Sequence, residues 1–280
     1  MLWITGCKGL LGAALVRASR QAVLATGKEV DIGDLAAVRQ FAEKHPGITH
    51  LVNCAAFSQV DAAEEFKEMA YHTNARGPGH LAIVAREMGA KLIHISTDYV
   101  FDGKGRTPLV ETAPTGPLNT YGKTKWEGEQ KVLEQGACVI RTSWLFGSGG
   151  QNFVSKLLKL LQTQRQIRLT DDQWSRFTYA PDLAQAILSV LDRTGLYQYA
   201  NRGVATKYEF GVAMREEACA LGYPIVTDEI LSVPGASFPS PCERPIYSAF
   251  DTSKMERIVN IRHWRDALKE FLCEQMPAYL

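Results

Sequence analysis

The stretch TGCKGLLG, residues 5–12, joins an apolar run, LWIT at 2–5, to a helical pattern, LLGAALVRASRQ. Gly6, Gly9 and Gly12 give it the form G-x-x-G-x-x-G, a variant of the dinucleotide-binding fingerprint. Glycines at this spacing permit a tight turn, close approach of the backbone to a pyrophosphate, and near contact between helix and strand. The helix start then offers amide donors and a partial positive charge to phosphates. A strand followed directly by this turn predicts a Rossmann-type unit; a glycine-rich turn without a ligand is the alternative.

Further along the chain, short apolar runs alternate with segments of helical periodicity. Strands are expected at 2–5, 22–26, 51–56, 91–97 and 137–147, and helices after the glycine turn, at 35–45, at 70–89 and from Tyr121. This alternation predicts an α/β fold with a doubly wound parallel sheet and helices on both faces. After about residue 147 the rhythm loosens, and Pro and Gly cluster at 234–245. We therefore expect a dinucleotide-binding domain at 1–147 and about 176–203, with a smaller C-terminal substrate lobe at about 148–175 and 204–280.

Composition excludes several classes of function. The net charge of +1 gives no reason to expect nucleic acid or an anionic membrane as a partner. No apolar run approaches the roughly 20 residues that span a bilayer, and LWITG after Met1 does not resemble a secretory signal. The six cysteines are scattered without a C-x-x-C pair, which predicts free thiols in a reducing cytoplasm. The six histidines show no metal-ligand spacing, so no metal is expected.

Two polar segments carry the candidate chemistry. In LNTYGKTKWEGE (118–129), Tyr121 and Lys125 are four residues apart and share one helix face, although this pair also occurs by chance in many helices. In ISTDYVFDG (95–103), Thr97 falls where the strand 91–97 leaves the sheet. A hydroxyl, a phenol and an ammonium converging there suit carbonyl reduction, which needs the carbonyl polarised and protonated. A phenol with a pKa of about 10 becomes a useful acid when a nearby cation favours its phenolate, and Lys125 supplies that cation.

The segment CAAF (54–57) ends the expected strand 51–56 with small residues. Ligands of such sheets bind outside the carboxyl ends of the strands, so small side chains there suit a flat cofactor lying across the sheet. Simple packing of small residues is an equally good explanation.

Motifs spread over nearly the whole chain carry a family resemblance. They are the glycine turn, VNCAAFSQVDAAE (52–64), STDYVFDG (96–103), YGKTKWEGE (121–129), RTSWLFG (141–147), NFV (152–154), DDQ (171–173), DLA (182–184) and ERPIYSAFDTSKM (243–255). In this order and spacing the chain resembles the extended short-chain dehydrogenase/reductase superfamily, and within it the dTDP-4-dehydrorhamnose reductase family. The resemblance implies a cytoplasmic enzyme, a monomer or homodimer, that uses NADPH or NADH to reduce a dTDP-linked 4-keto-6-deoxyhexose.

The resemblance also implies roles for individual residues. The cofactor would be bound by Gly6, Gly9, Leu10, Leu11 and Gly12 at its diphosphate, by Asp31 and Ile32 at its adenine, by Ala55, Ala56, Phe57 and Ile95 along its length, and by Tyr121 and Lys125 at the nicotinamide end. Tyr121 would donate the proton, and Lys125 would bond the nicotinamide ribose. The substrate would be bound by Thr97, Asp98, Trp144, Asn152 and Arg244.

Two of these substrate contacts have a structural alternative. Trp144 would pack against the deoxysugar ring, or serve as a core aromatic after a buried strand. Arg244 would meet the nucleotide or its phosphates, or form a structural pair with a carboxylate.

Cofactor preference is predicted from the end of the strand 22–26. A site selective for NAD places Asp or Glu there to bind the ribose 2′-hydroxyl. Positions 25–28 read Ala, Thr, Gly and Lys, which include no carboxylate. Lys28 either pairs with a 2′-phosphate or is a solvated loop lysine. NADPH is therefore expected to be accepted and preferred.

The segment after DDQ departs from the family pattern, and two alternative functions are also consistent with the sequence. After DDQ the chain reads WSRFTYA, where the family usually has a segment like G-S-P-T, which affects the local loop. One rival is an epimerase, a dehydratase or a reductase acting on another nucleotide 4-keto sugar. A dehydratase would want an acidic pair beside Thr97, and only Asp98 is present. The other rival is a non-catalytic regulatory subunit of the same fold, which need not keep Thr97, Tyr121 and Lys125.

Overall fold

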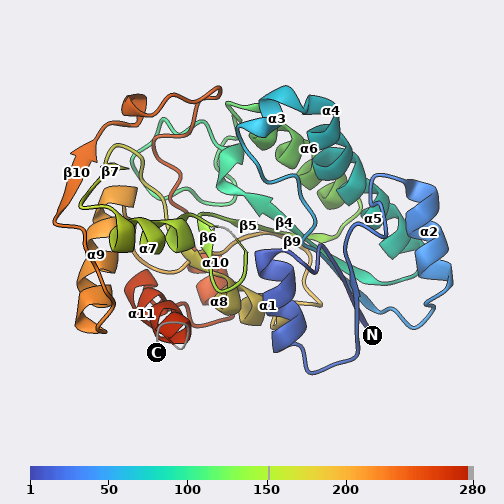
Figure 1. Ribbon diagram of the computed structural model, residues 1–280. Helices are drawn as coiled ribbons and strands as arrows, with labels where there is room; N and C mark the ends of the chain where they lie inside the picture. The colour runs from blue at the N-terminus through green and yellow to red at the C-terminus, as the bar shows by residue number, and fades with distance from the viewer. Residues whose placement is uncertain (151, 277–280) are drawn as a thin grey trace.

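The structure, a computed structural model, describes residues 1–150 and 152–276, and its main sheet lies between two layers of helices (Figure 1). Six strands pair in parallel in the order β2-β1-β3-β4-β5-β9. They are β1 (Leu2–Thr5), β2 (Val23–Thr26), β3 (His50–Asn53), β4 (Lys91–Thr97), β5 (Cys138–Thr142) and β9 (Gly195–Gln198). The prediction of a doubly wound parallel α/β sheet is confirmed. The strand order reverses at β1, which lies between β2 and β3, and doubly wound sheets bind their ligands at the carboxyl ends of the strands at such a point.

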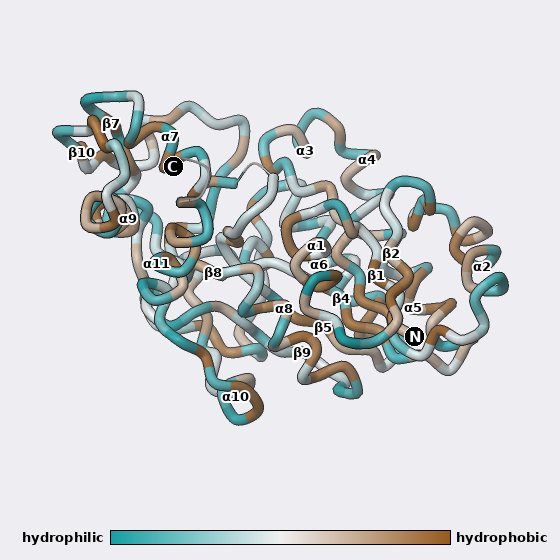
Figure 2. The backbone as a smooth tube through the Cα atoms, turned by 60° about the horizontal axis from the view of Figure 1, so that its bottom comes forward, coloured by the Kyte–Doolittle hydropathy of each residue, from teal (hydrophilic) through white to brown (hydrophobic). Residues whose placement is uncertain are grey.

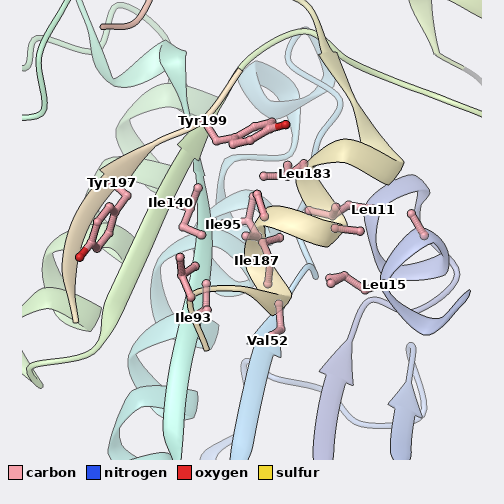
Figure 3. Close-up of a cluster of buried hydrophobic side chains, with 14 of the residues drawn as sticks. Leu11, Leu15, Val52, Ile93, Ile95, Ile140, Leu183, Ile187, Tyr197 and Tyr199 are labelled. Carbon is pink, nitrogen blue, oxygen red and sulfur yellow. The ribbon is translucent and has the colours of Figure 1, made fainter. Parts of the chain in front are cut away.

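Alternating side chains of the strands build one apolar layer on each face of the sheet. Leu2 and Ile4 belong to one buried cluster, and Trp3 between them belongs to another. The first cluster is drawn in Figure 3, where side chains of helices α1 and α8 face those of the strands. Figure 2 shows the tube of β1 and β4 largely in the hydrophobic colour. Each fully buried Leu or Ile contributes about 1.5–3 kcal/mol by leaving water.

The helices around the main sheet fall on its two faces. One face carries α1 (Leu10–Ala18) and α8 (Ala180–Leu188), and the other carries α2 (Leu35–Glu43), α5 (Gly77–Glu87) and α6 (Thr120–Glu134). Shorter helices connect them: α3 (Ala62–Glu65), α4 (Lys67–Tyr71), the π-helix η1 (His72–Arg76) and the 3-10 helix η2 (Asp98–Val100).

A second core lies in the C-terminal half, beside the main sheet in Figure 1. Its centre is aromatic: Phe177 stacks on Phe210 with ring centroids 3.8 Å apart, and Trp264 lies 4.9 Å from Phe210. Its elements are α7 (Phe153–Thr163), α9 (Lys207–Ala220), α11 (Trp264–Gln275), the pair β7 (Gln166–Thr170) and β10 (Glu229–Val233), and the pair β6 (Leu145–Phe146) and β8 (Thr178–Tyr179). Two short helices also lie in this half of the chain: η3 (Gly235–Ser237) and α10 (Ser253–Glu256), which packs against β9 of the main sheet.

These two cores support the division that we propose, with 1–147 and about 176–203 binding the cofactor and about 148–175 and 204–280 forming the substrate lobe. The return of α8 and β9 to the main sheet agrees with it. Met255 and Ile261 cross the division, since both pack in the cluster under the main sheet. Within the described residues, no helix has the length and apolar content needed to cross a membrane.

Two expected strands differ from the observed ones. The strand expected at 51–56 ends at Asn53. The Ala55 N–H bonds the Asn53 side-chain oxygen (3.0 Å) and not a neighbouring strand, so the sheet pairing stops there. The strand expected at 137–147 is wrong as a single element. Trp144 has φ +41°, in the left-handed region, and this turn sends β6 away from the main sheet to pair with β8.

Candidate active site

The glycine turn after β1 is shaped by close contacts. Gly6 has φ +65°, and a Cβ atom there would lie 2.6 Å from the Ala55 amide nitrogen. A Cβ atom on Gly12 would lie 2.3 Å from the Gly6 carbonyl oxygen. Helix α1 begins at Leu10, and its N-cap Gly9 offers no side chain to the first amides. The turn therefore presents backbone donors at the reversal of strand order, which is the geometry that accepts a pyrophosphate.

The segment 55–57 runs beside this turn and is fixed by two asparagines. Ala55 donates its N–H to Asn53 Oδ1. Phe57 donates its N–H to Asn74 Oδ1 (2.8 Å), and Asn74 Nδ2 donates back to the Phe57 carbonyl (3.1 Å). Asn74 lies in the π-helix η1, an irregularity that is frequent at functional sites. The small residues expected to line the cofactor are thus held rigidly at the crevice.

Where the adenine is expected to bind, two carboxylates lie near the loop after β2. Asp31 accepts hydrogen bonds from the His72 ring (3.0 Å) and from the Gly33 amide (2.9 Å), while Ile32 is buried. Glu29 folds back so that its carboxylate accepts the Gly27 N–H at 2.6 Å. The sequence analysis found no carboxylate at the end of β2, and the structure corrects this, because Glu29 reaches that position through the turn.

Tyr121 and Thr97 meet at the carboxyl end of β4. The helix carrying Tyr121 is anchored by Asn119, whose side chain accepts the Gly122 N–H (2.8 Å), and by Glu64, which accepts both donors of Thr120. Burial raises the pKa of the Tyr121 phenol to about 12, against a lowering by its hydrogen bond with Thr97. The phenol is therefore protonated at neutral pH and lies beside the Thr97 hydroxyl.

Lys125 is buried (2% exposed) and turned toward β4. Its Nζ donates to the Ile95 carbonyl at 2.5 Å and lies 3.3 Å from His94 Nε2. Burial lowers the pKa of Lys125 to about 8, although Glu129 and Cys54 oppose this shift. In the described part of the chain its hydrogen bonds go to these groups, not to Tyr121. The sequence predicted the Lys125 ammonium beside the Tyr121 phenol. In the structure this ammonium instead bonds the Ile95 carbonyl of β4.

Asp98 is a buried carboxylate at the floor of the site. It accepts hydrogen bonds from Ser248 (2.6 Å), Thr97 (3.2 Å) and Ser175 (3.4 Å). Burial raises its pKa to about 6 in spite of these donors. Ser175 belongs to the segment 174–177 that departs from the family pattern, and that segment therefore helps to hold Asp98. Sequence reasoning missed Ser175 and Ser248, because each lies more than 70 positions from Asp98.

Trp144 and Lys207 lie next to each other where the C-terminal lobe begins. The Trp144 ring is half-buried and packs edge-on against Phe177, with centroids 4.8 Å apart. Lys207 Nζ lies 5.2 Å from the Trp144 ring centroid and 3.5 Å from Gln173 Oε1. Burial, followed by the charge of Arg244, lowers the pKa of Lys207 to about 8. Lys207 is a third residue that sequence reasoning missed, since the first position of α9 carries no local signal.

Asn152 and Arg244 already have structural partners. Asn152 caps α7, accepting the Ser155 N–H (3.1 Å) while it donates to the Gly147 carbonyl (3.1 Å). Arg244 pairs with Asp61 through two hydrogen bonds of 2.8 and 2.9 Å and also bonds Ser240. The structural alternative for Arg244 is therefore realised, and contacts of both residues with a substrate remain predictions. Among the residues that the structure describes, no cluster of His, Cys, Asp or Glu could hold a metal ion.

The chain is similar in sequence to known proteins over nearly its whole length. A family model described as RmlD substrate binding domain matches residues 1–276. A dTDP-4-dehydrorhamnose reductase of Streptomyces griseus is 37% identical over 284 residues, covering 95% of this chain and 91% of that protein. The chain belongs to the dTDP-4-dehydrorhamnose reductase family. The resemblance seen in the sequence is thereby confirmed.

Two further relatives match nearly the whole chain. Spore coat polysaccharide biosynthesis protein SpsK of Bacillus subtilis is 38% identical over 284 residues, covering 98% of each chain. A crystal structure of the dTDP-4-dehydrorhamnose reductase of Bacillus anthracis, in complex with NADP, has a TM-score of 0.91 and 31% identity, with 98% of each chain covered. The Bacillus anthracis enzyme thus shares the architecture of this chain, including the C-terminal half.

Proposed function

We propose that the protein reduces the 4-keto group of dTDP-4-dehydro-L-rhamnose with NADPH or NADH to give dTDP-L-rhamnose. The observation that carries the proposal is the meeting of Tyr121 and Thr97 at the carboxyl end of β4, with Lys125 one helix turn on and the glycine turn at the carboxyl end of β1 in the same parallel sheet. Family membership supports this substrate, because the Streptomyces griseus relative bears that enzyme's name.

The residues of the chain act on the keto oxygen. A bound nicotinamide would supply the hydride that adds to C4 of the sugar. As the carbonyl electron pair moves onto oxygen, the Thr97 hydroxyl turns its one proton from Asp98 to that oxygen, and the Tyr121 O–H bond breaks and gives the oxygen its proton. Burial keeps Tyr121 protonated until a stronger base, the forming alkoxide, is present. The alcohol leaves, and Tyr121 must regain a proton.

The substrate is proposed to lie between the sheet edge and the C-terminal lobe. Trp144 offers an apolar ring to the sugar, and Lys207 offers an ammonium whose one hydrogen bond within the described residues is a long one to Gln173. Such a cation suits the diphosphate of the nucleotide. Asn152 and Arg244, which are partly exposed, would make further contacts with the substrate. We also propose a cytoplasmic location, which the six free cysteines support.

A second candidate is reduction of another nucleotide-linked 4-keto sugar. The contact of Ser175 with Asp98 supports this second candidate, because Ser175 belongs to the segment that departs from the family pattern. The two candidates share the same chemistry and differ only in the sugar.

Isotope transfer tests the proposal. The purified protein is incubated with dTDP-4-dehydro-L-rhamnose and NADPH carrying deuterium at nicotinamide C4, in separate samples for each of the two faces. One of the two samples should yield dTDP-L-rhamnose with deuterium at C4 of the hexose by NMR. Deuterium at another carbon, or no product with either nicotinamide cofactor, would contradict the proposal, and product from only a different 4-keto sugar would support the second candidate.

A further inference from the structure

A buried hydrogen-bond chain links the first strand to Lys125. Thr5 donates to Asn53 Oδ1 (2.7 Å), Asn53 Nδ2 lies 3.0 Å from His94 Nδ1, and His94 Nε2 lies 3.3 Å from Lys125 Nζ. None of the four side chains is more than 2% exposed. Hydride and proton transfer, as described above, leave Thr5, Asn53 and His94 without a role.

The chain fixes which nitrogen of His94 carries the proton. The Ala55 backbone N–H can only donate, and it lies 3.0 Å from the Asn53 side chain, so the Asn53 oxygen must face it. The Asn53 amide NH₂ then faces His94 Nδ1, which must accept. Burial, together with the charge of Lys125, lowers the pKa of His94 well below its usual range, so the ring is neutral. The ring proton therefore sits on Nε2 and points at Lys125.

This orientation matters for the charge of Lys125. An ammonium carries three N–H donors and no acceptor, so the His94 Nε2–H meets another donor as long as Lys125 is charged. A neutral amine has a lone pair that accepts the Nε2–H while it still donates to the Ile95 carbonyl. The contact favours the neutral amine.

The remaining groups around Lys125 act on its charge in opposite directions. On its own helix, Tyr121 precedes it by one turn and is neutral, and Glu129 follows by one turn with its carboxylate engaged by the buried guanidinium of Arg141 at 2.5 Å. The Cys54 thiol at the end of β3 is kept protonated by burial and so carries no charge. Glu129 favours the ammonium, burial and the His94 Nε2–H oppose it, and the resulting pKa of about 8 leaves Lys125 charged at neutral pH but ready to lose its proton.

We propose that His94 is a positioning residue which, held in one tautomer by Asn53, weakens the hold of Lys125 on its proton so that Lys125 can recharge Tyr121. The inference rests on the proposed function. After each reduction, the Lys125 ammonium turns from the Ile95 carbonyl toward Tyr121, one helix turn away; one of its N–H bonds breaks and an O–H bond forms on the Tyr121 phenolate. The neutral amine left behind accepts the His94 Nε2–H and is reprotonated from water. A proton donor is most effective when its proton affinity matches the working pH.

The first test reads the tautomer without catalysis. Substrate-free protein labelled with ¹⁵N-histidine should show His94 protonated on Nε2 and not on Nδ1. Asn53→Asp replaces the amide donor by a carboxylate that only accepts, so the proton should move to Nδ1. A wild-type ring protonated on Nδ1 would overturn the inference, whether or not the protein reduces any sugar, so this failure is distinct from failure of the proposed function.

The second test is the pH profile of kcat. In the wild type, kcat should fall as pH rises through about 8, because the Lys125 ammonium is lost. Both Asn53→Asp and His94→Phe remove the opposing donor, so the fall should move up by about one pH unit or more, a tenfold change in proton affinity. Thr5→Val is the matched control, because the Ala55 amide still orients Asn53, and its profile should match the wild type.

A purely structural role for His94 would lower kcat or thermal stability evenly at all pH values. An unmoved alkaline fall in both variants would therefore overturn the inference. If Asn53→Asp does not fold, the alkaline fall of kcat is measured in His94→Phe alone. This variant removes the ring nitrogens and leaves an aromatic side chain of similar size.

Discussion

Replacing Lys207 by Met should remove a contact made only when the nucleotide sugar is bound. Among the described residues the Lys207 ammonium has one hydrogen bond, 3.5 Å long, to Gln173. Burial lowers the pKa of Lys207 to about 8, so the surroundings disfavour its charged form in the free protein. A diphosphate beside it would relieve this cost. Met keeps the length of the side chain and its contact with Trp144 but supplies no charge.

The size of the effect follows from the bond that is lost. Hydrogen bonds to charged groups contribute about 1.5–3 kcal/mol, which corresponds to a loss of about 10- to 150-fold in kcat/KM for the nucleotide sugar. Binding should also be coupled to pH. Wild-type KM should rise as pH passes about 8, because the free protein then loses the ammonium, and this rise should be absent in Lys207→Met.

Steady-state kinetics on the nucleotide sugar, with NADPH affinity measured by fluorescence titration, check this prediction. Lys159→Met is the matched control, because Lys159 is exposed on α7 and should be neutral. A loss below about threefold, or an equal loss of NADPH affinity, would refute the placement of Lys207 against the diphosphate.

Three further predictions concern the cofactor and the proton donor. Tyr121→Phe should lower kcat by about 10²-fold or more with unchanged NADPH affinity, since a positioned acid is lost; near-normal turnover would mean that the proton comes from elsewhere. Gly12→Ala would place a Cβ atom 2.3 Å from the Gly6 carbonyl and displace the turn, so the Kd for NADPH should rise by about tenfold, and an unchanged Kd by titration would argue against the turn as the diphosphate site. Glu29→Gln should raise the ratio of kcat/KM with NADPH to that with NADH, and Lys28→Ala should lower it; ratios unaffected by either change would remove both residues from cofactor selection.

Parts of the fold and site were predictable because local patterns determine them. The glycine turn, the alternation of strands and helices, and the spacing of Tyr121 from Lys125 are properties of neighbouring residues. The contacts of Ser175 and Ser248 with Asp98 join segments far apart in the chain, so a local sequence pattern cannot predict them.

Two other features depended on tertiary packing. The break of the strand at Trp144 needs a positive φ in a non-glycine residue, which the packing of the second core imposes. The spacing placed Lys125 on the face of Tyr121, but only packing against β4 shows that its ammonium bonds the Ile95 carbonyl.

The most direct measurement of the central claim is the oxidation of NADPH by purified protein in the presence of dTDP-4-dehydro-L-rhamnose, followed by absorbance, with the sugar product quantified at the end. The account predicts equimolar loss of NADPH and gain of dTDP-L-rhamnose, slowed by about 10²-fold in the Tyr121→Phe variant. No oxidation with either NADPH or NADH, or the same rate in wild type and Tyr121→Phe, would contradict it.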